Sequence, residues 1–265
     1  MAREGAQSTP GGTMPPTAPR IRVGIGGWNY APWRGTFFPP GLPHRLELAH
    51  ASRQLTAIEV NATYYRTLQP ATFASWREQT PPGFVFSLKA SRFATNRKVL
   101  ATAAEPIARF VGSGIAELGD KLGPLLWQFM PTKRFDPGDF EAFLQLLPQR
   151  VGERPLRHVL DVRHESFACQ AYLDLARRYR CTTVYTDAPQ FPAIPDAASE
   201  LAYLRLMRSS ADCPTGYRPD AIAAWAQGAR AWTAMGPQRE VFVYFINGAK
   251  ERAPAAAAEL IRALA

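Results

Sequence analysis

The chain has 265 residues, of which 46% are hydrophobic, and a formal net charge of +9 at pH 7. This length suffices for one large domain with a sizeable core. No run of about 18 consecutive apolar residues is present, so we expect no membrane partner.

The positive charge indicates an anionic partner, either a phosphorylated small molecule or a nucleic acid. The preference for arginine over lysine is also typical of a genome rich in G and C. Charge alone therefore does not choose among these explanations.

Residues 1–20 are rich in Pro, Gly, Thr and Ala and lack the continuous apolar segment of a secretory signal. We expect a disordered N-terminal tail over 1–20 and a single domain over 21–265. Cys169, Cys181 and Cys213 are an odd number without close pairs, which indicates buried thiols in a reducing compartment. The expected location is therefore cytoplasmic.

Eight apolar runs between Ile21 and Asn247 are typical of β-strands. They are IRVGIGGWNY (21–30), AIEVN (57–61), FVFSLK (84–89), GPLLWQ (123–128), HVLDVRH (158–164), TTVYTD (182–187), AYLRLM (202–207) and VFVYFIN (241–247). The first run ends in glycines and aromatic residues. Each of the other seven has a polar or ionisable residue near its end, on one of the two sets of alternating positions.

Several connecting segments have apolar residues at helical spacing. The stripes are Leu100 to Leu118, Phe140 to Leu147, Tyr172 to Tyr179, Ile222 to Trp232 and Ala257 to Leu264. Strands that alternate with helices predict a parallel sheet with right-handed crossovers. Eight strands favour closure, and GIGGW (24–28) lacks the third glycine of a dinucleotide-binding turn. We therefore predict an α/β fold, a TIM (β/α)8-type parallel barrel in a single domain.

The two-residue repeat of a strand places alternate side chains on one face. We expect five triplets to face the barrel interior and to deliver their last residue to its carboxyl end, where TIM barrels bind substrates. They are Ala57, Glu59 and Asn61; Val85, Ser87 and Lys89; Val159, Asp161 and Arg163; Thr183, Tyr185 and Asp187; Val243, Phe245 and Asn247.

The chain also resembles a known family. The stretches GGWNYAPWRGTFFPPG, IEVNATYYR, SWREQTPPGFVFSLKAS, GPLLWQF, DVRHESF and VYFIN resemble, in this order and spacing, those of the YecE-like family, from about Ile21 to the C-terminus. The resemblance implies a TIM barrel whose activity is not established. It also implies a set of polar residues at the strand ends: Glu59, Lys89, Gln128, Asp161, Arg163, His164, Asp187, Arg205 and Asn247.

This chain departs from the family pattern at three places. Asp161 stands where glutamate is usual, and Asn96 follows Thr95 where a histidine is usual. Met207 and Arg208 replace a histidine-glycine pair. The last two departures remove histidines, so no role is transferred to those positions.

Four ionisable residues are the candidate catalytic groups, because neighbouring charges and partial burial shift pKa values toward acid-base work. They are Glu59, Lys89, Asp161 and Asp187. The alternative is a structural salt-bridge network that plugs the barrel. A further alternative is that Lys89, in a site of low dielectric constant, attacks a carbonyl group as a Schiff-base nucleophile.

The candidate substrate-binding residues supply positive charge, amides or aromatic rings. They are Trp28, Tyr30, Asn61, Tyr64, Gln128, Arg163, His164, Arg205 and Asn247. Other aromatic residues of the first loop, Trp33, Phe37 and Phe38, are expected to cap the barrel.

We expect neither a metal nor a cofactor. Of the four histidines only His164 follows a strand, whereas hydrolytic metal sites use several. A single divalent ion on Glu59, Asp161 and Asp187 ranks lower, because the nearby lysine and arginines already supply positive charge.

The resulting hypothesis is a metal-independent enzyme, a lyase, isomerase or hydrolase, that acts on a small anionic substrate, either phosphorylated or sugar-like. The alternative is a nucleic-acid-binding or nucleic-acid-processing protein that uses its basic surface and aromatic loops. Positive charge concentrated inside the mouth favours the first, and a basic stripe outside it favours the second. The sequence makes no prediction of oligomeric state.

Overall fold

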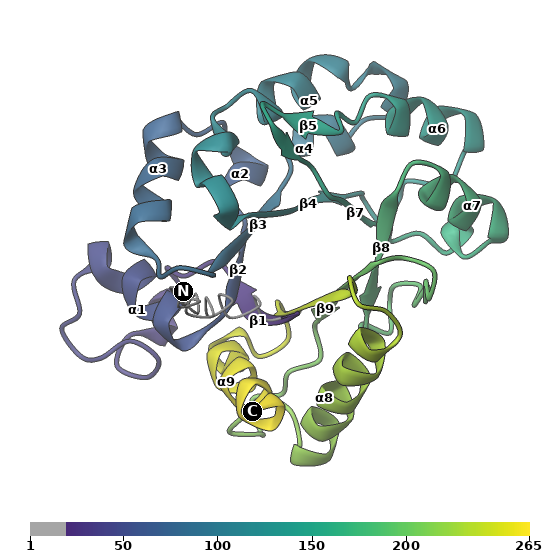
Figure 1. The fold of residues 1–265 in the computed structure, drawn as a ribbon. Coiled ribbons are helices and arrows are strands. Elements are labelled where there is room, and N and C mark those ends of the chain that lie inside the picture. The colour runs from purple at the N-terminus through teal and green to yellow at the C-terminus, as the bar shows by residue number, and fades with distance from the viewer. Residues whose placement is uncertain (1–19) are drawn as a thin grey trace, which may run out of the picture.

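A computed structural model describes residues 20–265 (Figure 1). Eight parallel strands form a closed barrel in the order β1-β10-β9-β8-β7-β4-β3-β2. Their bounds are β1 Ile21–Gly26, β2 Ala57–Val60, β3 Val85–Lys89, β4 Leu122–Gln128, β7 His158–Asp161, β8 Cys181–Thr186, β9 Leu201–Leu206 and β10 Glu240–Phe245. Each of the eight predicted runs overlaps one strand of the barrel, so the predicted TIM-type barrel is confirmed.

Helices surround the barrel on the outside (Figure 1). The α-helices are α1 Glu47–Gln54, α2 Ala62–Tyr65, α3 Pro70–Gln79, α4 Arg92–Thr95, α5 Ala104–Val111, α6 Pro137–Gln145, α7 Gln170–Arg178, α8 Pro219–Ala234 and α9 Ala253–Leu264. Short 3-10 helices cover Ala31–Trp33, His44–Leu46, Leu100–Thr102, Ile115–Lys121, Glu165–Phe167 and Lys250–Arg252. A small antiparallel hairpin, β5 Arg150–Val151 and β6 Arg154–Pro155, lies outside the barrel.

Strand alternation divides the apolar residues into two cores. The outer core lies between barrel and helices and includes Ile58, Phe86, Leu160, Val243 and Phe245. The inner core fills the barrel and includes Ala57, Val85, Leu126, Val159, Val184, Tyr203, Phe242 and Tyr244. Most strands carry apolar residues on both faces because helices cover the outside.

The residues of the inner core show that the predicted inward faces of β8 and β10 are wrong. On β8 the inner core contains Val184, so Thr183, Tyr185 and Asp187 have the outward parity. On β10 it contains Phe242 and Tyr244, whereas Val243 and Phe245 belong to the outer core. A strand that is apolar on both faces does not reveal which face is inside, and a one-residue shift reverses every side chain.

The stripe from Leu100 to Leu118 is not one helix. The segment forms a 3-10 turn, then α5, then the 3-10 helix Ile115–Lys121. Gly114 interrupts it with a φ of 103°, and a Cβ at this position would lie 2.7 Å from Pro70. The chain bends here because only glycine adopts this conformation easily and fits against Pro70.

The tail expected over 1–20 lies outside the described residues except for Arg20, which donates to the carbonyl groups of Thr233 and Gly236. All three cysteines are free. Cys181 is buried as expected, but Cys169 and Cys213 are only half-buried. In the part of the chain that the structure describes, no helix is long and apolar enough to cross a membrane.

Candidate functional site

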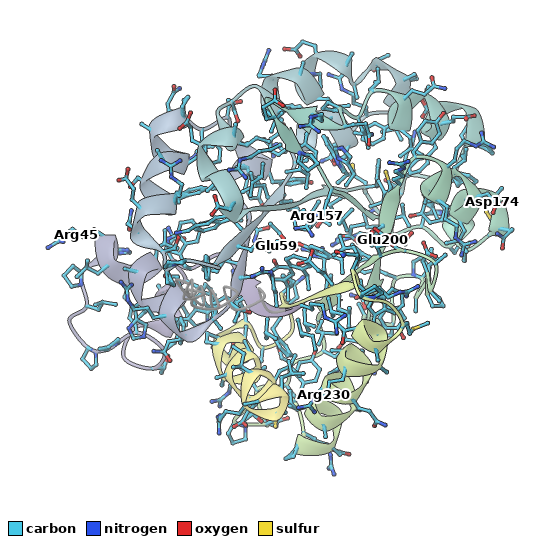
Figure 2. All side chains as sticks on the ribbon, in the orientation of Figure 1. Arg45, Glu59, Arg157, Asp174, Glu200 and Arg230 are labelled. Atoms are coloured by element: carbon cyan, nitrogen blue, oxygen red, sulfur yellow. The ribbon has the colours of Figure 1, made fainter. Side chains whose placement is uncertain are left out.

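A buried network of charges lies inside the carboxyl end of the barrel, with Arg205 of β9 at its centre. Nε and Nη2 of Arg205 donate to the two carboxylate oxygens of Glu59, at 3.1 and 3.0 Å. Its Nη1 donates to Oδ2 of Asp161 at 2.6 Å. Arg205 is 1% exposed, and Figure 2 shows Glu59 within the ring of strands.

The neighbours of Arg205 extend this network. Tyr203, two residues earlier on β9, donates its hydroxyl to Oε2 of Glu59 at 2.9 Å. Arg163 donates to Oδ2 of Asp161 at 3.0 Å and to Oε1 of Gln128 at 2.9 Å. Both oxygens of Glu59 are therefore occupied, whereas only Oδ2 of Asp161 accepts hydrogen bonds from described residues.

The carboxylates keep Arg205 charged despite its burial. Burial alone would lower its pKa, but the charges of Glu59 and Asp161 outweigh this and raise the pKa above its ordinary value. Burial, followed by the negative charge of Glu59, raises the pKa of Tyr203. The phenol therefore stays protonated and serves as a donor.

Lys89, at the end of β3, is a third cation beside this network. It is 7% exposed, and no carboxylate among residues 20–265 forms an ion pair with it. Its Nζ lies 4.1 Å from the ring centroid of Tyr64. Burial, reinforced by the charge of Arg205, lowers the pKa of Lys89 to about 8. A fraction of Lys89 is thus a neutral amine near neutral pH.

Apolar residues lie beside this charged network. The inner core contains Ala188, Met207 and Ile246, which follow β8, β9 and β10, and Phe191 packs against it. The guanidinium of Arg163 lies 4.5 Å from the ring centroid of Phe191. Glu59, Asp161 and Arg205 are therefore buried, whereas Arg163 and Gln128 are half-buried.

Three predicted site residues lie apart from the network. Asp187 accepts from the backbone N–H of Met207 at 2.6 Å and from the Tyr217 hydroxyl at 2.7 Å. His164 bonds through Nδ1 to Ser166 and caps a 3-10 helix. Asn247 is exposed, and its carbonyl accepts from Ser209. These contacts organise loops, so the structure does not unite these three residues with Glu59, Lys89 and Asp161.

At the two places where the family pattern has a histidine, Asn96 and Met207 have ordinary packing roles, whereas Asp161, the remaining departure, belongs to the charged network. Asn96 lies 3.4 to 3.5 Å from the Tyr64 hydroxyl and so supports the ring that faces Lys89. Met207 is buried in the inner core, and Arg208 is exposed.

A pocket of about 340 Å³ lies at the ends of β1 and β2, and no residue of the charged network lines it. Trp28, Tyr30 and Asn61 line it, as do the cations Arg66 and Lys250, and no acidic residue does. Nζ of Lys250 lies 4.7 Å from the centroid of Tyr30, and burial lowers the pKa of this lysine. The pocket thus combines aromatic rings with positive charge.

Sequence reasoning missed several members of this region. Tyr203 shares the parity of Arg205, so the two-residue repeat could have found it. Phe191 stands in a loop and Lys250 begins a short 3-10 helix, and in neither segment does a periodic pattern indicate which residues return to the barrel end.

No group of three or more His, Cys, Asp or Glu residues within 20–265 is arranged to hold a metal ion. His158 begins β7 at the opposite end and is buried, with contacts to Trp127 and the Pro148 carbonyl.

A family model described as "Protein of unknown function DUF72" matches residues 22–265. The chain belongs to the DUF72 family. This confirms the YecE-like resemblance seen in the sequence motifs. A comparison with curated proteins gave no match.

Solved structures of the family share the fold. A DUF72 protein from Thermotoga maritima aligns with a TM-score of 0.70 and 19% identity, over 91% of this chain and 97% of that chain. One from Enterococcus faecalis aligns with a TM-score of 0.69 and 16% identity, over 92% and 95%. A structure named SacUVDE aligns with a TM-score of 0.57 and 8% identity, over 92% and 98%. At these identities the likeness concerns the fold alone.

Proposed function

We propose that this DUF72 protein is an enzyme that acts on a small anionic substrate, phosphorylated or sugar-like, at the carboxyl end of its barrel. The burial of Lys89 without an ion-pair partner is the observation that supports this proposal most. Its ammonium group is buried, and the described residues supply no ion pair for it.

The charges of the buried network do not cancel. Glu59 and Asp161 are paired with Arg205 and Arg163, and Lys89 adds one cation to two pairs. Burial of an unpaired charge is costly, so a purely structural plug would gain nothing from this lysine. An anionic group of a substrate would complete the balance.

The network suggests a division of roles. Arg205 and Tyr203 hold Glu59 in place, so Glu59 is a positioning residue. Lys89 binds the anionic group or exchanges a proton with the substrate, because its lowered pKa suits acid-base work. Asp161 retains one oxygen without a described partner and can accept a proton. The pocket at the ends of β1 and β2, with Trp28 and Tyr30, receives the remainder of the substrate.

A thermal-shift screen with phosphorylated and sugar-type metabolites tests this function. A ligand at about 100 times its Kd should raise the melting temperature of the wild type by about 5 to 10 °C. Lys89→Met should abolish this shift. Lys98→Met, which removes an exposed lysine from the same end of the barrel, should retain it. A compound that stabilises all three proteins equally would place the binding elsewhere.

Schiff-base formation with a carbonyl substrate is a more specific version of the role proposed for Lys89. A neutral lysine amine can attack a carbonyl group, and borohydride then reduces the imine to a stable adduct. Incubation with anionic carbonyl compounds and borohydride should label Lys89 in the wild type. An absence of labelling across a broad panel would remove this form and leave the acid-base role.

A second candidate function is the binding of single-stranded nucleic acid. Two exposed rings, Tyr65 at 58% and Phe93 at 55% exposure, stand on α2 and α4. The Arg92 guanidinium lies 5.8 and 5.4 Å from their centroids. Residues 61–69 and 90–103, which contain these rings, carry four cations and no carboxylate: Arg66, Arg92, Arg97 and Lys98. Exposed rings with neighbouring arginines suit stacked bases and phosphates.

Fluorescence anisotropy with a labelled oligothymidylate tests this second function. We expect affinity that falls steeply as salt rises, and about tenfold weaker binding by the Tyr65→Ala, Phe93→Ala double variant. Met235→Ala removes an equally exposed apolar side chain from α8's end and serves as the control. Binding that is unaffected by the double variant would exclude this surface.

A further inference from the structure

The pocket at the ends of β1 and β2 carries positive charge that no residue of its lining balances. Arg66 and Lys250 line it, and no acidic residue does. Neither cation forms an ion pair with a carboxylate among residues 20–265. Nζ of Lys250 lies 4.7 and 5.7 Å from the ring centroids of Tyr30 and Trp33. These rings hold the ammonium group at the pocket wall without neutralising it.

The lining also contains groups that donate hydrogen bonds to an anion. Thr72 of α3 supplies a hydroxyl group, and Asn61 supplies an amide. A phosphate monoester carries a charge of about −1.5 to −2 at pH 7 and has three strong acceptor oxygens. The two cations of this pocket therefore match one phosphate group more closely than they match one carboxylate.

A short stretch of chain joins this pocket to Lys89. Residues 60–62 line the pocket. The next residue, Thr63, donates its hydroxyl to the carbonyl group of Lys89 at 2.8 Å. Tyr64 follows, and its ring centroid lies 4.1 Å from Nζ of Lys89. The pocket wall and the contacts of Lys89 are thus one to two residues apart along the chain.

The inner rim of the pocket borders the barrel interior. Gly26 and Asn61 both line the pocket. A Cβ at Gly26 would lie 3.3 Å from the amide nitrogen of Asn61 and 3.3 Å from Ile246, which belongs to the inner core. The absence of a side chain at Gly26 therefore keeps space between the pocket and the interior, where Lys89 is buried.

We propose that the substrate is a phosphorylated carboxylic acid. Its phosphate binds Arg66, Lys250 and Thr72 in the pocket, and its carboxylate supplies the single negative charge that Lys89 lacks. The carbon chain between the two groups passes Asn61. This inference rests on the proposed anion-binding role of Lys89, and it adds a second anionic group and the place where that group binds.

Isothermal titration calorimetry of the full chain with three open-chain sugar derivatives tests this substrate class. 6-Phosphogluconate carries both anionic groups, gluconate carries only the carboxylate, and sorbitol 6-phosphate carries only the phosphate. The wild type should bind 6-phosphogluconate at least about tenfold more tightly than either of the other two probes, because hydrogen bonds to charged groups contribute this much or more.

Two variants assign the two groups to their sites. Lys250→Met should weaken the binding of both phosphorylated probes at least about tenfold and leave gluconate unchanged. Lys89→Met should weaken the binding of 6-phosphogluconate and gluconate and leave sorbitol 6-phosphate unchanged. Arg45→Met removes an exposed cation at the outer edge of the molecule (Figure 2) and should bind all three probes as the wild type does.

Three outcomes would overturn this inference: equal affinity of the wild type for 6-phosphogluconate and gluconate, a phosphate preference that persists in Lys250→Met, and no binding of any probe. Gluconate binding that is lost in Lys89→Met would still support the anion site at Lys89, even when the phosphate adds nothing. A phosphate preference that requires Lys250, together with no effect of Lys89→Met on any probe, would instead contradict the proposed role of Lys89.

Discussion

Arg205 is the residue on which the charges at the barrel end depend. Its guanidinium is held by two carboxylates from different strands, Glu59 of β2 and Asp161 of β7. A buried charge pair is not necessarily stabilising, but the loss of one partner leaves the other uncompensated.

Glu59→Gln should therefore destabilise the fold by about 3 to 5 kcal/mol, because Arg205 would lose one of its two buried anions, the one that accepts two of its hydrogen bonds. Chemical denaturation measures this loss. Glu105→Gln, which breaks an exposed pair with Arg109, should change the free energy of unfolding by less than about 0.5 kcal/mol. A loss below about 1 kcal/mol for Glu59→Gln would show that the network is open to water.

The charge of Lys89, unlike the paired charge of Glu59, should destabilise the fold. Its pKa is about 8 in the folded protein and about 10.4 in the unfolded chain. Below pH 8 both states hold the proton, and the cost of burying the charge is fully present. Between pH 8 and 10.4 the folded state releases the proton first, so folding becomes more favourable as the pH rises.

The wild type should consequently gain up to about 3 kcal/mol relative to Lys89→Met between pH 8 and 10.4. Urea denaturation at several pH values and constant ionic strength measures this difference. Lys98→Met controls for the removal of a charge. Parallel profiles for the wild type and Lys89→Met would contradict the unpaired burial of Lys89.

At the scale of elements, the apolar runs predict where strands lie better than which way they face. Ala57, Val85 and Val159 face the interior as expected, and Glu59, Lys89 and Asp161 follow them. The same reasoning is wrong for β8 and β10, because β10 is apolar on both faces and β8 has threonines on both faces, so neither strand shows a contrast between its faces. Asp187 and Asn247 were for this reason assigned to the site, whereas they contact loops.

The break after α5 gives a test at the same scale. Gly114→Ala should destabilise the fold by about 2 to 4 kcal/mol, because the new Cβ would meet Pro70 and strain the backbone. Gly83→Ala has a similar positive φ but meets no atom within 4 Å, so only the strain of about 1 to 2 kcal/mol should remain. Thermal denaturation of both variants would reveal the difference. Equal losses would mean that contact with Pro70 contributes nothing.

For the whole molecule, the barrel and most of the charged residues at its carboxyl end could be predicted from the sequence, because strands, helices and terminal polar residues repeat along the chain. Which of these charged residues pair with one another could not be predicted from the sequence. Nothing in the order of residues indicates that Arg205 takes both Glu59 and Asp161 and leaves Lys89 without a carboxylate. That outcome depends on three-dimensional distances across a closed barrel.

The gap in the ring of helices between β8 and β9 was likewise not predictable. A loop of 14 residues between two strands is visible in the sequence, but its effect on Asp196 and Trp232 appears only when the barrel closes around it. Among the described residues, Lys89 thus lacks an ion-pair partner inside the barrel end, and Asp196 and Trp232 each have an unpartnered buried polar atom outside the barrel.

Titration of the Lys89 side chain by heteronuclear NMR in the intact protein tests the central claim most directly. The signal is assigned by its absence from the spectrum of Lys89→Met. An unpaired, buried ammonium group beside Arg205 should titrate with a pKa of about 8. A pKa near 10.4, the ordinary value for lysine, would show that Lys89 is solvated or paired and would contradict the proposed anion site.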